Sequence, residues 1–227
     1  AICISAAADR KVQVVNYSME TAYLGSNVNF IHEDSTHRVW FGTKRGLICL
    51  AKNKEGYVPA PYLKSQSHVY SPAYNFTGTA NDALGNVFFA TAQGIMVTYD
   101  SKAQAFSQTR IGNGEITDIL VSRTGSVYLT MPGQGLKIYD PKNTTLQQKN
   151  GQATYLAMYE DQIGNIWLEP EKDGAVLYSP AADKFRVFVH KKEHNLPFLA
   201  REGFINDRSF KVVEDIKGTV WVSLKGG

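Results

Sequence analysis

Two acidic pairs, Glu160–Asp161 and Glu214–Asp215, are the side chains in this sequence that are best suited to general acid/base chemistry. Each pair opens the same short phrase, "EDQIGNIWLEP" in one place and "EDIKGTVWVSL" in the other. An aspartate at the first position of a tight turn accepts a hydrogen bond from the backbone amide two residues later. Because both pairs recur at such a turn, we interpret them as turn-forming residues and not as a catalytic pair.

The other residues that could support catalysis or bind a metal are scattered along the chain. The histidines fall in four different repeats or connections, at His32, His37, His68, His190 and His194. The sequence has no H-x-x-x-H on an expected helix, no G-x-S-x-G and no phosphate loop, and Cys3 and Cys49 have no spacing typical of zinc sites. We therefore predict no catalytic residue, no metal site and no cofactor, and we expect that the chain is not an enzyme.

The charge and hydropathy patterns argue against two further classes of protein. The net charge is only +3, and the Lys and Arg residues form no basic stripe of the kind that binds nucleic acid. No run of about eighteen apolar residues, the length of a membrane-spanning helix, is present. Residues 1–10, "AICISAAADR", fit either the end of a secretory signal peptide or an edge strand, and the sequence leaves both open.

One phrase recurs five times along the chain. The copies lie at residues 33–50, 81–100, 121–140, 160–180 and 214–227. Each copy has an aromatic anchor at the same place, namely Trp40, Phe88, Tyr128, Trp167 and Trp221, at intervals of 48, 40, 39 and 54 residues. A period in the forties with about four short strands per unit is the signature of propeller blades. We predict an all-β chain, with residues 1–227 forming a single partial β-propeller domain of about four and a half four-stranded blades.

Each copy contains the residues that a β-hairpin needs. A turn Asp, or Ser122 in the third copy, is followed three residues later by a Gly that can adopt positive φ. His37 takes the place of this Gly in the first copy, and His tolerates the left-handed region better than most residues. The segment that follows, such as "VFFAT", is apolar on both faces and predicts a strand that is covered on both faces. We interpret the aromatic anchor as a wedge between neighbouring blades.

The pattern E-D-x-x-G-x-[IV]-W-[IV], followed by G-[LIV]-x-x-[YL]-[DS], resembles the two-component regulator propeller repeat. The resemblance covers about residues 28–227 and is closest in "EDQIGNIWLEP" and "EDSTHRVWFGTKRGLICL". The chain departs from the pattern at His37, which replaces the turn Gly, and at Ser122, which replaces the turn Asp. It also has Phe88 and Tyr128 where the repeat has Trp.

This resemblance implies a role as well as a fold. Such repeats are typical of the periplasmic sensor region of hybrid two-component systems, in which a histidine kinase and a response regulator are fused, in polysaccharide-utilising gut bacteria. The resemblance implies that this chain is a fragment of a seven-bladed propeller. It further implies that this propeller senses a glycan-derived oligosaccharide and relays the signal across the membrane. The implied partners are the remaining propeller and the β-sandwich of the parent chain, and a second copy in a homodimer.

Ligand binding is expected on the loops at the face where the chain enters each blade. The loops between the second and third strands share this face and carry Lys44, Arg45, Gln93, Gln134, Glu171 and Lys172. Two long entry loops, 52–75 and 190–208, reach the same face and carry Tyr62, His68, Tyr70, Arg201 and Arg208. Tyr rings suit sugar faces and Arg suits acidic groups. The alternative is that these loops pack on a neighbouring propeller.

Two other functions stay open at this point. One is a propeller enzyme that acts on polysaccharide, such as a lyase or a hydrolase, which would need an acid/base pair on one face. The other is a propeller that only binds other proteins.

Overall fold

The computed structural model describes residues 2–6, 12–16, 28–54, 56–59, 74–172, 174–188 and 212–222, with backbone alone for 2–6, 12–16 and 56–59. Every regular element in these residues is a β-strand, and every strand pairing is antiparallel. The described part of the chain contains no helix that could cross a membrane.

Four of the sheets are four-stranded, and in each the strands are neighbours in the order of the sequence. Blade 1 consists of β3 (Val28–Glu33), β4 (Val39–Thr43), β5 (Gly46–Asn53) and β6 (Gly56–Pro59). Blade 2 consists of β7 (Phe76–Asn81), β8 (Val87–Thr91), β9 (Ile95–Asp100) and β10 (Ala105–Arg110). Blade 3 consists of β11 (Asp118–Val121), β12 (Val127–Thr130), β13 (Leu136–Asp140) and β14 (Thr145–Lys149). Blade 4 consists of β15 (Tyr155–Glu160), β16 (Ile166–Pro170), β17 (Ala175–Ser179) and β18 (Lys184–Phe188).

Two further sheets have two strands each. The first pairs β1 (Ile2–Ala6) with β2 (Val12–Asn16), and the second pairs β19 (Val212–Glu214) with β20 (Val220–Val222). The predicted all-β fold of four-stranded blades is confirmed. One expected loop is wrong in part, because β5 extends to Asn53 and pairs with β6, so the predicted loop 52–75 begins with a hairpin.

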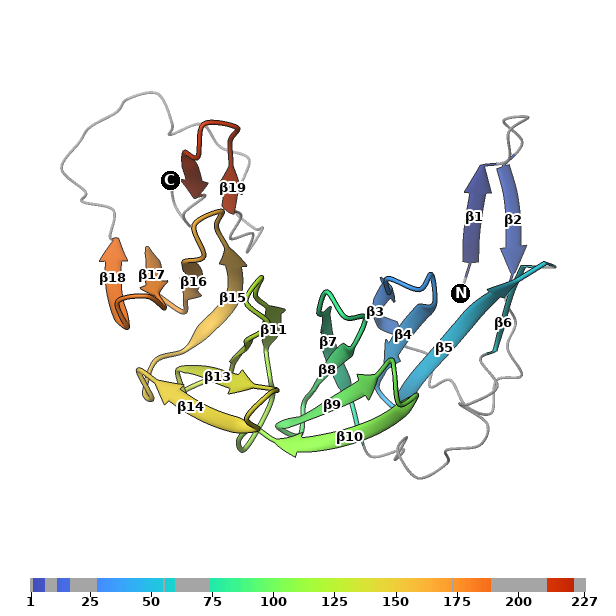
Figure 1. The fold of residues 1–227 in the computed structure, drawn as a ribbon, viewed down its shortest axis with the longest axis horizontal. Helices are drawn as coiled ribbons and strands as arrows, with labels where there is room; N and C mark the ends of the chain where they lie inside the picture. Colours follow the sequence, from blue (N-terminus) through green and yellow to red (C-terminus); the bar gives the residue numbers. More distant parts are fainter. Residues whose placement is uncertain are drawn as a thin grey trace.

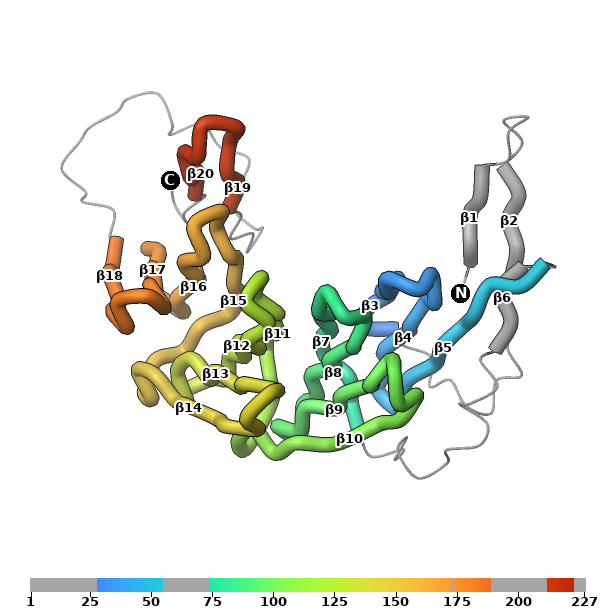
Figure 2. The backbone as a smooth tube through the Cα atoms, in the orientation of Figure 1, coloured from blue at the N-terminus to red at the C-terminus, as the bar shows by residue number. Residues whose placement is uncertain are grey.

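The blades follow one another along an open arc, with the first strand of each blade on its inner side (Figure 1). Neighbouring first strands contact one another, β3 with β7, β7 with β11 and β11 with β15. Figure 2 traces the same arc as a tube from β3 in blue to β20 in red. Each four-stranded sheet therefore presents its two faces to its neighbours along the arc, as the apolar second strands predict.

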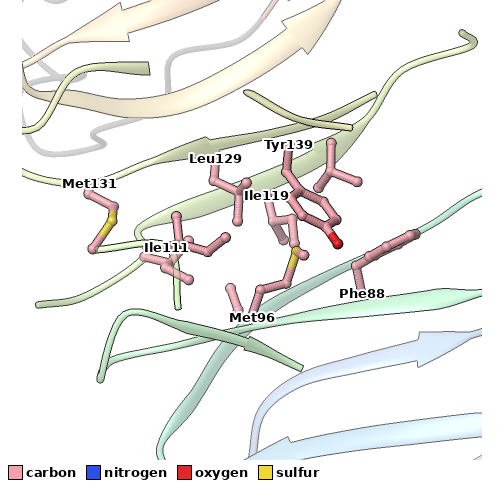
Figure 3. Packing of buried hydrophobic residues seen from close by; sticks show 10 residues of the cluster. Phe88, Met96, Ile111, Ile119, Leu129, Met131 and Tyr139 are labelled. Carbon is pink, nitrogen blue, oxygen red and sulfur yellow. The ribbon is translucent and has the colours of Figure 1, made fainter. Parts of the chain in front are cut away.

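The hydrophobic core is divided into clusters that lie between successive blades. Figure 3 shows the cluster between blades 2 and 3, where Phe88 and Met96 meet Ile119, Leu129 and Tyr139. A second cluster joins blade 1 to blade 2, and a third joins blade 3 to blade 4. Burial of one large apolar side chain in such a cluster contributes about 2–3 kcal/mol.

The first three anchors lie in these clusters, each facing the blade that follows. Trp40 is 0% exposed, Phe88 is 2% exposed and Tyr128 is 4% exposed. Trp40 contacts Phe89 and Tyr99 of blade 2 with ring centroids 5.1 and 5.2 Å apart. These three rings therefore fill the joints between blades.

The last two anchors differ from this pattern. Trp167 is half-buried and stacks on Phe188 of its own blade with ring centroids 5.5 Å apart. Trp221 is 64% exposed, so the expectation that its ring is buried between blades is wrong for this structure. Because each anchor faces the following blade, its burial requires a further sheet on that side, and no described strand comes after β20.

The wedge role of the anchors predicts a large difference between two residues of blade 2. We expect Phe88→Ala to lower the free energy of unfolding by about 3–5 kcal/mol, because it leaves a cavity between blades 2 and 3. Leu84, at the turn of the same blade, is 80% exposed, and we expect Leu84→Ala to change stability by less than about 0.5 kcal/mol. Urea denaturation followed by Trp fluorescence measures both, and equal losses for the two variants would contradict a wedge at Phe88.

Candidate functional site

An aspartate organises the turn between the first and second strands in blades 1, 2 and 4 and the equivalent turn between β19 and β20. The Oδ1 atom of Asp82 accepts hydrogen bonds from the backbone amides of Leu84 and Asn86, both at 2.9 Å. Asp34, Asp161 and Asp215 accept the equivalent pair of amides in their own turns. These bonds confirm the turn-forming role predicted for the aspartates. His37 adopts φ of 61°, the left-handed conformation expected of it.

A second function of the turn aspartate was not predicted from the sequence. In blades 1 and 4 and in the β19–β20 hairpin, which have a Trp anchor, the indole Nε1–H donates to Oδ2 of the Asp six residues earlier. The distance is 2.7 Å from Trp40 to Asp34, 3.0 Å from Trp167 to Asp161 and 3.3 Å from Trp221 to Asp215. The constant spacing from Asp to Trp was the signal that could have revealed this bond. The carboxylate thus joins the turn to the anchor.

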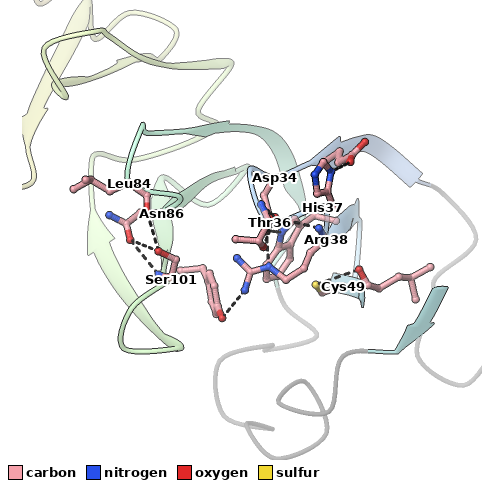
Figure 4. A network of polar contacts seen from close by, with 12 residues as sticks. Asp34, Thr36, His37, Arg38, Cys49, Leu84, Asn86 and Ser101 are labelled. Atoms are coloured by element: carbon pink, nitrogen blue, oxygen red, sulfur yellow. Dashed lines mark hydrogen bonds and ion pairs between the residues drawn. The ribbon is translucent and has the colours of Figure 1, made fainter. Parts of the chain in front are cut away.

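Asp34 and Asp161 are both buried, and Figure 4 shows the surroundings of Asp34. Arg38 Nε donates to Asp34 Oδ2 at 2.7 Å, and Arg38 Nη1 donates to the Tyr99 hydroxyl of blade 2 at 2.8 Å. Although burial by itself would raise it, hydrogen bonds from Trp40, Thr36 and Arg38 hold the pKa of Asp34 below its ordinary value. Asp34 thus holds the turn and the anchor of blade 1 together, and its partner Arg38 makes the contact with blade 2, so Asp34 is structural.

The glutamates of the two acidic pairs bridge successive blades. Glu160 accepts a hydrogen bond from the backbone amide of Arg123 in the turn of blade 3, at 3.0 Å. Glu214 accepts one from the amide of Gln162 in the turn of blade 4, at 2.7 Å. In each pair, the Glu therefore binds the preceding turn while the Asp binds its own.

The opposite face of the arc, where the chain enters each blade, carries the turns between the second and third strands and is called the entry face below. Lys44 and Arg45 lie in the turn between β4 and β5, and Glu171 and Lys172 follow β16. All four are exposed, and within the described residues their side chains make no hydrogen bond or ion pair. The first pair belongs to blade 1 and the second to blade 4, so the structure places them on one face but does not bring them together.

The other predicted ligand residues lie outside the described residues. These are Tyr62, His68, Tyr70, Arg201 and Arg208. Their role stays a prediction.

Two amides that were expected to face a ligand instead bind loops of the protein. The Gln93 side chain accepts a hydrogen bond from the Asn75 amide at 3.1 Å, and Gln134 Nε2 donates to the Asn113 carbonyl at 2.5 Å. The Gly133 amide donates to Thr154 Oγ1 of the next blade at 2.9 Å. The two glutamine amides are therefore engaged within the protein, whereas the charged loop tips Lys44, Arg45, Glu171 and Lys172 are exposed.

An open polar groove lies on the other face, beside the turn of blade 1. It is lined by Glu33, Thr36, His37, Lys52, Asn53 and Lys54 and has a volume of about 590 Å³. His37 Nδ1 lies 2.6 Å from Glu33 Oε1. No three metal-binding side chains gather anywhere in the described part of the chain.

A half-buried carboxyl lies between the first strands of blades 3 and 4. Asp118 accepts hydrogen bonds from its neighbour Ile119 at 2.9 Å and from the Met158 amide of blade 4 at 2.7 Å. Burial outweighs these two bonds and raises the pKa of Asp118 to about 6. Both oxygens are occupied by backbone amides, so the carboxyl belongs to the joint between the blades and is not placed to act on a substrate.

Comparison with solved structures identifies the fold as a β-propeller. The chain is similar to virginiamycin B lyase from Staphylococcus aureus, with a TM-score of 0.61 and 10% identity over 83% of this chain and 62% of the lyase. It is also similar to the extracellular domain of the putative hybrid two component system BT4673 from B. thetaiotaomicron (TM-score 0.52, 15% identity, 89% of this chain and 32% of that one). The corresponding domain of BT3049 from the same organism gives a TM-score of 0.57 at 12% identity, over 94% of this chain and 28% of that one.

The chain thus spans less than two thirds of the length of these structures. No protein-family model matches it, and no curated protein matches it in sequence. The likeness therefore shows a propeller fold that resembles hybrid two-component sensor domains, among other propellers.

The raised pKa of Asp118 predicts how stability depends on pH. Because the folded carboxyl holds its proton more readily than the unfolded one, the stability that it contributes is fully present below about pH 3.8 and is lost as pH rises through about 6. Asp118→Asn removes this titration, so the variant does not lose this stability as pH rises. We therefore expect the free energy of unfolding of the variant, relative to that of the parent, to rise by about 2 kcal/mol between pH 4.5 and 7.5.

Urea denaturation across this pH range tests the prediction. Asp140→Asn is the control, because hydrogen bonds from Asn143 and the Lys142 amide hold the pKa of Asp140 below its ordinary value, so it titrates at lower pH. If the stability difference between Asp118→Asn and the parent is as independent of pH as that of the control, the raised pKa of Asp118 is refuted.

Proposed function

We propose that this chain is part of the extracytoplasmic sensor region of a hybrid two-component system and that it binds a glycan-derived oligosaccharide. The observation that carries the proposal is the likeness to two such extracellular domains over 89% and 94% of this chain. The exposed charged loop tips of the entry face support it, since no described side chain occupies them.

Binding would take place on the entry face. The guanidinium of Arg45 and the ammonium of Lys44 suit the carboxylates of an acidic sugar, and Glu171 suits sugar hydroxyls as a hydrogen-bond acceptor. A ligand that binds one arrangement of the sensor domains more tightly than another shifts the population toward it. In this proposal the remaining propeller and the β-sandwich of a longer parent chain, as a homodimer, transmit the shift to a kinase across the membrane.

A second candidate function is lyase activity, which the likeness to virginiamycin B lyase favours. Incubation of the chain with polysaccharides, followed by absorbance of unsaturated products, tests this alternative. Formation of such products would replace the sensor proposal with an enzymatic one.

Calorimetry with neutral and uronic-acid oligosaccharides tests the sensor proposal. We expect Lys44→Ala/Arg45→Ala to weaken binding of an acidic oligosaccharide by at least about tenfold, the equivalent of one well-placed ionic hydrogen bond. Lys102→Ala/Lys142→Ala is the matched control, because both residues are exposed in turns on the opposite face. An equal effect of both double variants would refute a site at Lys44 and Arg45, and a lack of binding by any sugar would refute the proposed ligand.

A further inference from the structure

The polar groove beside the turn of blade 1 lies between two hairpins of that blade. The turn between β3 and β4 forms one wall, and the end of β5 with the turn that follows it forms the other. The lining residues are Glu33, Thr36 and His37 on the first wall and Lys52, Asn53 and Lys54 on the second. The volume of about 590 Å³ lies within the range of about 300–1,000 Å³ that small-molecule sites occupy. The groove is therefore large enough to hold a small ligand.

The second wall departs from the pattern of blade 2. Equivalent positions in two blades are defined by the third-strand residue that lies opposite the anchor, which is Cys49 in blade 1 and Thr98 in blade 2. Three residues further on, Lys52 of blade 1 therefore takes the place of Ser101 of blade 2. A small neutral side chain is thus replaced by a long cationic one.

The first wall departs from the repeat at the position that faces Lys52. His37 lies three residues before its anchor, as Gly85 does in blade 2. In blade 2 a Cβ atom at Gly85 would lie 3.4 Å from Ser101 Oγ, and that hydroxyl donates to the Leu84 carbonyl at 3.0 Å, so the two hairpins are in contact. In blade 1, His37 and Lys52 line the groove instead. Both departures from the repeat therefore meet at the groove.

A third departure removes negative charge from this end of blade 1. Asp100 and Asp140 end the third strands of blades 2 and 3, and each accepts a backbone amide of the turn that follows, at 2.8 Å and 2.9 Å. By the same register, the equivalent residue of blade 1 is Ala51, and β5 continues beyond it to Asn53. The outer turn of blade 1 therefore lacks the carboxylate that its counterparts have at this position.

The lining residues carry more positive than negative charge. Lys52 and Lys54 are exposed, and their side chains make no hydrogen bond or ion pair with another described residue. Glu33 is the only carboxylate among the described lining residues, and its Oε1 atom lies 2.6 Å from Nδ1 of His37. The two ammonium groups are therefore available to an anion, whereas the carboxylate is engaged.

We propose that this groove binds a tetrahedral oxoanion, namely the phosphate or sulfate group of a small ligand. The ammonium groups of Lys52 and Lys54 donate to the anion oxygens, in charge-assisted hydrogen bonds that are about twice as strong as neutral ones. The ring of His37 forms the opposite wall of the site. The site lies on the face opposite to the sugar site proposed above and does not depend on it.

Calorimetry with the full 227-residue chain at about 0.15 M salt tests this proposal. The probes are inorganic phosphate, inorganic sulfate, glucose 6-phosphate and glucose 6-sulfate, with glucose as the neutral control. We expect the anions to bind and glucose not to bind. Tighter binding of the esters would identify an ester as the ligand class and equal binding would identify the free ion, and both results agree with the proposal. Binding of none of the four anions at up to about 10 mM would overturn it.

Two groove variants show whether binding takes place between the two walls. Lys52→Ser/Lys54→Ser gives the second wall the residue type of Ser101, and we expect at least about tenfold weaker binding because both ionic hydrogen bonds are lost. His37→Gly restores the turn residue of the other blades, which favours positive φ, and we expect at least about threefold weaker binding because the opposite wall is removed.

Two control variants carry matched changes elsewhere. Lys102→Ser/Lys142→Ser alters exposed lysines in the corresponding turns of blades 2 and 3, and Lys44→Ala/Arg45→Ala alters the entry face. We expect both to bind the anions as the parent does, and circular dichroism checks that each variant is folded. Equal weakening by the lysine control would show that the anions bind exposed lysines in general. That result, or an unchanged affinity in either groove variant, would overturn the proposal.

Discussion

The carboxylate of the turn aspartate is the group that organises blades 1, 2 and 4. One oxygen accepts two amides of the turn, and the other accepts the indole N–H of the anchor where that anchor is Trp. In blade 1 the same side chain therefore fixes the hairpin and orients the Trp40 ring that packs on blade 2. Blade 3 shows the dependence by its exception: Ser122 replaces the aspartate, and the anchor Tyr128 has no ring N–H to donate. Ser122 instead contacts the Thr124 hydroxyl and the Ser126 carbonyl.

Contacts between blades repeat in the same way along the arc. Glutamates 160 and 214 accept amides from the preceding turn, and Arg123 donates to the carbonyls of Asp161 and Gln162. On the entry face, the Gly133 amide donates to Thr154 in the loop that enters the next blade, and Gln134 donates to the Asn113 carbonyl in the loop that enters its own blade. Each blade consequently depends on its immediate neighbours, as in other repeat proteins, where stability is close to a sum of unit and interface terms.

Much of the fold follows from local sequence, because turn residues and strand patterns act over a few residues. The left-handed φ of His37 and the double-sided burial of "VFFAT" are both of this kind. Burial of an anchor is different, because it depends on a sheet contributed from elsewhere in the chain. Trp40 and Trp221 hold the same place in the same phrase, yet they are 0% and 64% exposed. Likewise, the sequence predicted that Lys44 and Glu171 lie in turns on the same face. Two blades separate these residues in the structure, which limits the site that they can form together.

The division of polar groups between the two faces bears on how such an arc could respond to a ligand. On the opposite face, which carries the turns of the aspartates, the turn carboxylates and amides form hydrogen bonds within and between blades. A ligand that bound these groups would compete with the contacts that hold the arc together. On the entry face, backbone groups and the Gln93 and Gln134 amides are similarly occupied, but the charged tips project beyond them. A ligand at these tips gains ionic contacts without breaking a bond between blades. Binding that spans tips of different blades is also sensitive to the angles between those blades, which is the property that a sensor of domain arrangement requires.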